Sequence, residues 1–293
     1  MVEPATGPAP IYALLTVATH RIDLAVYELD DPVVVSDLDG AASRGLAVRV
    51  LLDSHLEHGA NTAAATNLAA HHVEVAWADP AETLHEKVVC IDGVTCDVLT
   101  FNLTPRYYAT SRDFAVVDTQ PGDVAAIEQT FAGDLTGATP GPAPAGTDLL
   151  WSPGSGPALV ALIGSARRTV RVENEEMGNP PIEKALTAAA RRGVVVEVTM
   201  TADPEWNSAL AALVAAGVQV HTYAPSAPLF IHAKAVVVDG GPAGGTAFVG
   251  SENFSLASLD HNRELGLVTS APSVVVPLDG NLAADFAGGT PWS

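Results

Sequence analysis

Two short segments of the sequence repeat one pattern: a histidine, a lysine two residues later and an aspartate five residues after the lysine. The repeated residues are His85, Lys87 and Asp92 in the first segment and His232, Lys234 and Asp239 in the second. The whole chain has only three lysines, so two such pairs are not expected by chance. In a β-strand, residues two apart lie on one face, so each segment would present an imidazole beside an ammonium group. Two imidazoles and two ammonium groups of this kind could together form a small basic pocket.

The surrounding sequence repeats with the two motifs, which are 147 residues apart (232 − 85) in a chain of 293. The segment 18–32 aligns with 166–180, and each begins with the alternating pattern of a strand. A helix-like stretch that ends in Arg-Gly and a second strand follow in both halves, from Ala41 and from Ala188. This order predicts an α/β fold made of duplicated α-β-α sandwich halves with mixed sheets.

The repeat also predicts the domain organisation. We expect an N-terminal half over residues 1–135, a C-terminal half over 147–293 and a Pro/Gly-rich connector over 136–146. Duplicated halves that pack about a pseudo-two-fold axis would bring equivalent surfaces face to face. The two His-Lys pairs would then meet across one cleft and form a small basic pocket in an acidic protein.

The composition limits the classes of partner. Acidic residues outnumber basic ones by 34 to 14, and the resulting net charge of −20 disfavours general binding to nucleic acid. Hydrophobic residues make up 48% of the chain, which is enough for a packed core. Because no run of 18 apolar residues occurs, no membrane-spanning helix is expected. The first residues lack the basic and apolar regions of a signal peptide, so the protein is expected to be cytoplasmic or to have lost a leader.

The two cysteines, Cys90 and Cys96, flank a turn candidate at residues 91–95. A three-residue hairpin loop could place them opposite each other, so a disulfide and a pair of separate small thiols both remain open. A metal site is not expected from two thiols without Cys-x-x-Cys spacing.

The two motifs and the residues that follow them resemble the phospholipase D superfamily. Its signature is His-x-Lys-x(4)-Asp, then Gly-Ser/Thr-x-Asn, then a later carboxylate. The second half matches the later part of this signature with Gly250, Ser251, Asn253 and Glu264. The first half matches it with Thr100, Asn102 and Asp113, but has Leu99 where the family usually has glycine.

The resemblance implies a phosphodiesterase that needs no metal and no cofactor. By similarity to family members with two motifs, His85 is assigned as the nucleophile that forms a phosphohistidine and His232 as the acid and base, although the reverse order remains open. The groups expected to neutralise the phosphate are Lys87, Lys234, Asn102, Asn253, Ser251 and Thr100.

The resemblance also assigns roles to the carboxylates. Asp113 and Glu264 lie 28 (113 − 85) and 32 (264 − 232) residues after the histidines of their own halves, and each is expected to orient that imidazole. Asp92 and Asp239 are expected to hold structure. The acidic segment 173–176 aligns with 25–28, and we expect it to edge a substrate cleft or to be solvated rather than to bind metal.

The family pattern specifies the bond, and three hypotheses remain for the substrate. The first is an enzyme that hydrolyses phospholipids, or transfers their phosphatidyl group, as a monomer with peripheral contact to a lipid surface. The alternatives are an endonuclease acting on DNA or RNA and a non-catalytic phosphate-binding module. The chain resembles secreted bacterial members of the family, so we expect secretion, with the signal peptide absent from this sequence, and keep the cytoplasm as the alternative.

Overall fold

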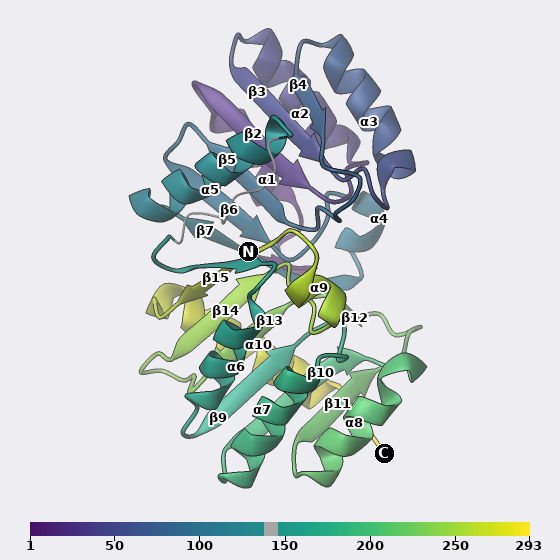
Figure 1. Cartoon of the computed structure of the whole chain (residues 1–293), viewed down its shortest axis with the longest axis vertical. Helices are drawn as coiled ribbons and strands as arrows, with labels where there is room; N and C mark the ends of the chain where they lie inside the picture. Colours follow the sequence, from purple (N-terminus) through teal and green to yellow (C-terminus); the bar gives the residue numbers. More distant parts are fainter. Residues whose placement is uncertain (138–145) are drawn as a thin grey trace.

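The computed structural model describes residues 1–137 and 146–293, and it contains two eight-stranded mixed sheets with helices on both faces (Figure 1). One sheet with its helices forms the upper unit of the molecule in Figure 1, and the other forms the lower unit. The predicted duplicated α/β fold with mixed sheets is therefore confirmed. Of the predicted connector, residues 138–145 lie outside the described residues.

The first sheet has the strand order β1-β7-β6-β5-β2-β3-β4, and its eighth strand, β12 (Phe230–Ile231), comes from the second half of the chain and pairs with β7. Its strands are β1 (Val2–Glu3), β2 (Arg21–Val26), β3 (Ala47–Leu52), β4 (Glu74–Trp77), β5 (Lys87–Ile91), β6 (Thr95–Leu99) and β7 (Ser111–Asp118). The helices are α1 (Ala9–Val17), α2 (Pro32–Ser43), α3 (His58–Ala70), α4 (Pro105–Tyr108) and α5 (Pro121–Leu135). Helices α1 to α3 pack on one face and α5 on the other, so the central strands are apolar on both faces.

The second sheet has the order β16-β11-β10-β9-β13-β14-β15-β8. Its strands are β8 (Leu149–Ser152), β9 (Thr169–Glu173), β10 (Val195–Thr201), β11 (Gln219–Tyr223), β13 (Ala235–Val238), β14 (Thr246–Gly250), β15 (Glu264–Thr269) and β16 (Thr290–Pro291). Its helical segments are α6 (Gly156–Gly164), α7 (Pro180–Arg191), η1 (Pro204–Trp206), α8 (Asn207–Ala215), α9 (Leu256–Asp260) and α10 (Pro272–Gly288). Helices α6 to α8 pack on one face and α10 on the other.

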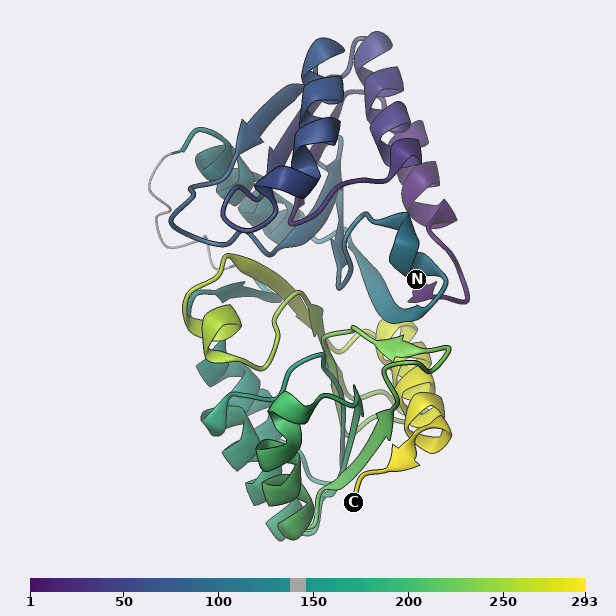
Figure 2. The ribbon, with the colours of Figure 1, turned by 90° about the vertical axis from the view of Figure 1, so that its right-hand side faces the viewer.

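The two units repeat one topology. The order β7-β6-β5-β2-β3-β4 in the first sheet corresponds to β15-β14-β13-β9-β10-β11 in the second. The lone covering helices, α5 and α10, lie on opposite sides of the molecule in Figure 2, as a two-fold relation requires. The strands that carry the two lysine motifs, β5 and β13, thus occupy equivalent central positions beside β2 and β9.

Each unit holds the segment that precedes the lysine strand of the other unit. Strand β12 (Phe230–Ile231) leaves the second unit and pairs in parallel with β7 of the first. In return, the backbone N–H of His85 donates to the carbonyl of Arg263, just before β15, at 2.8 Å. The second motif, expected as one strand, is therefore interrupted between Ile231 and Ala235, because its two parts pair with different sheets.

The turns after the two lysine strands are held by the motif aspartates. Asp92 has a positive φ of 56°, and its carboxylate accepts hydrogen bonds from the backbone N–H groups of residues 19, 20 and 21 at 2.9, 2.7 and 2.9 Å. Asp239 accepts from the N–H groups of residues 167, 168 and 169 at 3.1, 2.6 and 3.0 Å. Burial alone would raise the pKa of Asp92, but these hydrogen bonds and one from the Thr19 hydroxyl hold it below its usual range. Both aspartates thus fasten a turn to the start of the neighbouring strand.

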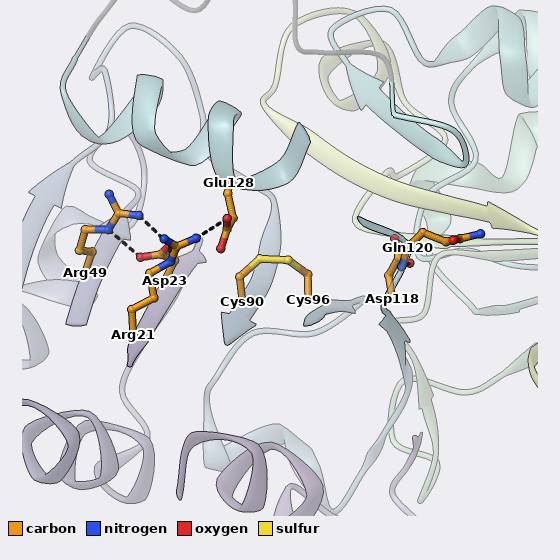
Figure 3. Close-up of a disulfide and its surroundings, with 8 residues drawn as sticks. All are labelled: Arg21, Asp23, Arg49, Cys90, Cys96, Asp118, Gln120 and Glu128. Atoms are coloured by element: carbon orange, nitrogen blue, oxygen red, sulfur yellow. Dashed lines mark hydrogen bonds and ion pairs between the residues drawn. A yellow bond between two sulfur atoms is a disulfide. The ribbon is translucent and has the colours of Figure 1, made fainter. Parts of the chain in front are cut away.

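The cysteines form a disulfide across the hairpin of β5 and β6. Cys90 and Cys96 are directly paired in the strand register, with their Cα atoms 4.0 Å apart (Figure 3). The three-residue loop 92–94 produces this register, so of the two possibilities left open by the sequence the structure contains the disulfide. None of the helices in the described part of the chain is both long enough and apolar enough to span a bilayer.

Candidate active site

A cavity of about 670 Å³ opens between the two units and is lined by both. The first unit contributes His85, Asn102 and Asp113, among others, and the second contributes His232 and Asn253. The sequence-predicted histidines and asparagines of both halves therefore meet at one site.

Each histidine is oriented by a carboxylate of the other unit. His85 Nδ1 lies 2.7 Å from Glu264 Oε2, and His232 Nδ1 lies 2.9 Å from Asp113 Oδ1. The expectation that each carboxylate serves the histidine of its own half was wrong. The reason is the exchange of segments described above: β15 begins beside the chain that carries His85, and β7 runs beside the chain that carries His232.

Further hydrogen bonds hold the two carboxylates in place. Glu264 Oε1 accepts from the hydroxyl of Ser258 at 2.6 Å and from the side-chain amide of Asn262 at 3.1 Å. Burial alone would raise the pKa of Glu264, but the neighbouring His85 and Lys87 hold it below its usual range. An ionised carboxylate at Nδ1 keeps a proton there and leaves Nε2 for the cavity.

The charge state of His85 follows from its surroundings. Burial lowers the pKa of His85, and the Glu264 carboxylate opposes this effect without reversing it. A neutral ring with its proton on Nδ1 has a lone pair on Nε2, which is the form that can act as a nucleophile.

The two lysines are fully buried but have different partners. Lys234 Nζ donates to the carbonyl of His232 at 2.6 Å and to Glu175 Oε2 at 2.9 Å. Lys87 Nζ donates to the carbonyl of His85 and lies 5.3 Å from the centre of the Tyr27 ring. Burial lowers the pKa of Lys87 to about 7, although the Glu264 carboxylate favours its charged form. The Lys234 ammonium thus has an anionic partner, whereas the Lys87 ammonium lies over the face of an aromatic ring.

The hydroxyls predicted to bind phosphate do not line the cavity. Thr100 is fully buried, donates to Asp113 Oδ1 at 2.6 Å and accepts from the N–H of Phe114 at 2.9 Å. Ser251 is fully buried too, and its Oγ accepts from the N–H of Leu265 at 3.1 Å. Both hydroxyls are used between strands, so Thr100 supports the carboxylate of Asp113 and Ser251 supports β15.

Two cavity residues contact the two histidines although sequence analysis assigned neither of them an individual role. Tyr27 follows β2, and its ring meets the His85 ring edge-on with the centres 4.9 Å apart. Glu175 follows β9 at the equivalent position, and its Oε2 lies 3.5 Å from His232 Nε2. Glu175 and Tyr27 occupy corresponding positions in the alignment of residues 173–176 with 25–28. Of the acidic segment, Glu175 and Glu176 line the cavity as expected, but Glu173 is fully buried elsewhere.

The wall of the cavity is acidic and aromatic rather than basic. The carboxylates that line it beyond the histidine partners are Glu3, Glu28, Glu57, Glu175 and Glu176, and the aromatic residues are Tyr27, Phe101, Tyr107, Tyr108 and Phe230. Arg106 also lines the cavity, but its guanidinium donates to Glu28 at 2.7 Å. Within residues 1–137 and 146–293, no group of three His, Cys, Asp or Glu side chains is arranged to hold a metal ion.

Comparisons with known proteins agree with this architecture. The family model described as cardiolipin synthase, PLD-like domain, matches residues 11–135 and 159–286. A polyphosphate kinase from Porphyromonas gingivalis superposes with a TM-score of 0.73 at 15% identity, over 97% of this chain and 49% of the kinase. A phosphatidylserine synthase from Haemophilus influenzae superposes with a TM-score of 0.72 at 12% identity, over 99% of this chain and 86% of the synthase.

A third solved structure matches one half of the chain. Nuc from Salmonella typhimurium, a phospholipase D family member, is 24% identical over 49% of this chain and 95% of its own, with a TM-score of 0.44. The chain spans about half the length of the polyphosphate kinase. No curated protein sequence matches it significantly. At these identities the two high-scoring structures show a common fold alone.

Proposed function

Since the chain belongs to the phospholipase D superfamily, we propose that it cleaves phospholipids at the phosphodiester bond through a phosphohistidine on His85. One observation carries the proposal. Two imidazoles, each held at Nδ1 by a carboxylate, face one cavity together with two asparagines, and a buried lysine lies beside each imidazole. This constellation contains the nucleophile, the acid and the charge that phosphodiester cleavage needs.

The first step is attack on phosphorus. The lone pair of His85 Nε2 forms the N–P bond as the bond from phosphorus to the alcohol oxygen breaks, and the leaving oxygen takes a proton from His232 Nε2. Burial favours the neutral ring of His85. Both nitrogens of His232 face carboxylate oxygens, Asp113 at 2.9 Å and Glu175 at 3.5 Å, so each has an acceptor for a proton. These contacts support His85 as the nucleophile.

The second step releases the phosphatidyl group from His85. His232 Nε2 takes a proton from water, the water oxygen attacks phosphorus, and the N–P bond breaks to restore His85. When another alcohol replaces water, the same step transfers the phosphatidyl group. During both steps the two lysines and the two asparagines, Asn102 and Asn253, would stabilise the non-bridging oxygens.

The charge of the cavity supports a phospholipid over a nucleic acid as substrate. The net charge of −20 and the carboxylates around the cavity oppose a polyanion, whose binding depends on many phosphate contacts. The loop residues Pro225 and Ala227, with Phe230, bring apolar groups to the wall of the cavity, where acyl chains or a lipid surface could contact them. The disulfide supports the proposal that the protein is secreted. A monomer would suffice, because one chain carries both motifs.

A parallel activity assay tests the proposal. Wild type, His85→Ala and His71→Ala would be incubated with phosphatidylcholine vesicles, phosphatidylglycerol vesicles, and single- and double-stranded DNA, with and without ethanol. His71 is half-exposed and lies outside the cavity, so it is the matched histidine control. We expect release of the head-group alcohol by wild type and His71→Ala, none by His85→Ala, and phosphatidylethanol when ethanol is present.

The other outcomes of this assay separate the alternatives. Cleavage of DNA but not lipid, lost in His85→Ala, would replace the phospholipase by a nuclease. If no substrate is cleaved, phosphate binding is measured separately by calorimetry. Binding that survives in His85→Ala would then mean that the protein is a binding module and that the proposed function is wrong.

A further inference from the structure

We propose that Glu175 makes the site select phosphodiester monoanions over phosphomonoester dianions, because it holds a fixed negative charge against Lys234 where a phosphate would bind. This inference rests on the proposed function, in which the substrate is a diester and one product is a monoester. It assigns a specificity-determining role to the residue that breaks the symmetry of the two halves.

The contacts of Glu175 place its carboxylate in the phosphate position. Its Oε2 is 2.9 Å from Lys234 Nζ and 3.5 Å from His232 Nε2. Two oxygens of a bound phosphodiester would use these nitrogens: a non-bridging oxygen would contact the Lys234 ammonium, and the leaving oxygen would take the proton of His232 Nε2. The side chain of Glu175 therefore occupies, in the free protein, a position that the substrate needs.

The backbone around Glu175 is fixed, whereas its carboxylate can move. The side chain of Asn174 accepts from the N–H groups of Glu176 and Phe254 at 3.1 and 3.0 Å and donates to the carbonyl of Glu252 at 3.2 Å. The Glu175 side chain is 31% exposed, while that of Lys234 is 0% exposed. An incoming phosphate can thus push the carboxylate toward solvent, and the buried ammonium stays behind to bind it.

The charge of Glu175 persists when the carboxylate moves aside. Burial alone would raise the pKa of Glu175, but in the free protein Lys234 and His232 hold it below its usual range. After the carboxylate moves toward solvent it stays ionised at pH 8, because a solvated glutamate has a pKa far below 8. A charge that remains within a few ångströms of the phosphate repels a dianion about twice as strongly as a monoanion. A phosphate monoester carries close to two charges near pH 7, so the monoester product is repelled more than the diester substrate.

The first half has no such charge at the equivalent position. Tyr27 replaces the carboxylate and presents its ring to Lys87 and His85 instead. A ring face attracts an ammonium group but does not compete with it for a phosphate oxygen. The anionic competitor is therefore confined to the side of the site that carries His232, where the leaving group departs.

Binding of inorganic phosphate at pH 8 tests this inference without turnover. Isothermal titration calorimetry would measure the binding of phosphate and of dimethyl phosphate, a monoanionic diester, to wild type, Glu175→Gln, Glu175→Asp and Glu57→Gln. Glu57→Gln makes the same change elsewhere on the cavity wall, and Glu175→Asp keeps the charge. We expect phosphate to bind about tenfold or more tightly to Glu175→Gln than to wild type, and within about threefold of wild type to the other two variants. Dimethyl phosphate should gain clearly less affinity in Glu175→Gln, and an equal gain for both ligands would contradict the selection.

Two other results would overturn the inference. One is unchanged or weaker phosphate binding in a folded Glu175→Gln protein, as judged by its circular dichroism. The other is equal tightening in Glu57→Gln, which would reduce the effect to the overall charge. A wild-type protein that cleaves no phospholipid while Glu175→Gln gains phosphate affinity would refute the proposed function alone, because the binding measurement needs no catalysis.

Discussion

The two halves of the site have the same scaffold but different surroundings. Each supplies a histidine, a buried lysine, an asparagine and a carboxylate that lie in equivalent strands or next to their ends. After the central strand, however, the first half has Tyr27 and the second has Glu175. A duplicated scaffold is symmetric by origin, whereas nucleophilic attack and proton donation are opposite tasks. The comparison shows how a single residue beside the repeated histidine and lysine, Tyr27 or Glu175, can distinguish the nucleophile from the proton donor.

The halves also differ in how they pack behind the site. Gly250 lies where the Glu252 carboxylate and the backbone of Gly266 leave no room for a Cβ atom. Its counterpart Leu99 is fully buried in the apolar core of the first half. Two residues after Leu99 the first half has Phe101, where the second half has Glu252 two residues after Gly250.

Replacing either histidine should have the largest effect on catalysis and should distinguish the roles of the two halves. We expect His85→Ala and His232→Ala each to lower kcat by about 10³-fold or more. Acid quench of a reaction with phosphorus-labelled lipid should trap label on the protein in His232→Ala, because His85 remains to form the N–P bond. Label trapped in His85→Ala instead would reverse the two roles.

The crossed carboxylates should give effects that depend on the leaving group. Glu264→Gln and Asp113→Asn are each expected to lower kcat by about 10²-fold on a phospholipid. A p-nitrophenyl diester needs little acid assistance, so it should restore most of the rate of Asp113→Asn, which orients the acid, and little of the rate of Glu264→Gln. The single-turnover rate of nitrophenol release measures this difference.

The opposite pattern would contradict either the crossed pairing or the assignment of His85 as nucleophile and His232 as acid. If the activated diester rescues Glu264→Gln and not Asp113→Asn, each carboxylate would serve the histidine of its own half or the two histidines would exchange roles. Ser258→Ala, which removes one hydrogen bond to Glu264, serves as a milder variant on the same side.

The residue between histidine and lysine should give the smallest effect, on stability. The first half has Glu86, which is buried, and the second has Ala233. Burial raises the pKa of Glu86 to about 8, although the charge of Arg263 opposes it. Between the ordinary pKa of a glutamate and pH 8, Glu86 is protonated in the folded state but ionised in the unfolded state. The free energy of unfolding therefore decreases as the pH rises through this window.

Urea unfolding at pH 5 and pH 8 would measure this contribution. We expect Glu86→Gln to be more stable than wild type by roughly 2 kcal/mol at pH 8 and to differ little at pH 5. Exposed Glu82→Gln is the control. Equal differences at both pH values would mean that Glu86 does not carry the proton.

Local spacing and the internal repeat were enough to predict the fold class and the family. The His-Lys pairs, the 147-residue offset and the alternation of strands and helices are properties of short segments, and short segments encode them directly. The same reasoning identified His85, His232, Lys87 and Lys234, which the structure brings to one site, and the comparisons confirm the superfamily.

Only the tertiary structure decided which groups face each other. The sequence placed Asp113 and Glu264 at the right distance along the chain, but the exchange of β12 and of the segment before Lys87 gave each carboxylate to the histidine of the other half. The buried Thr100 hydroxyl donates to Asp113 and does not line the cavity, and Glu175 contacts Lys234. Contacts between segments far apart in the chain depend on how the two sheets pack, which no local pattern contains.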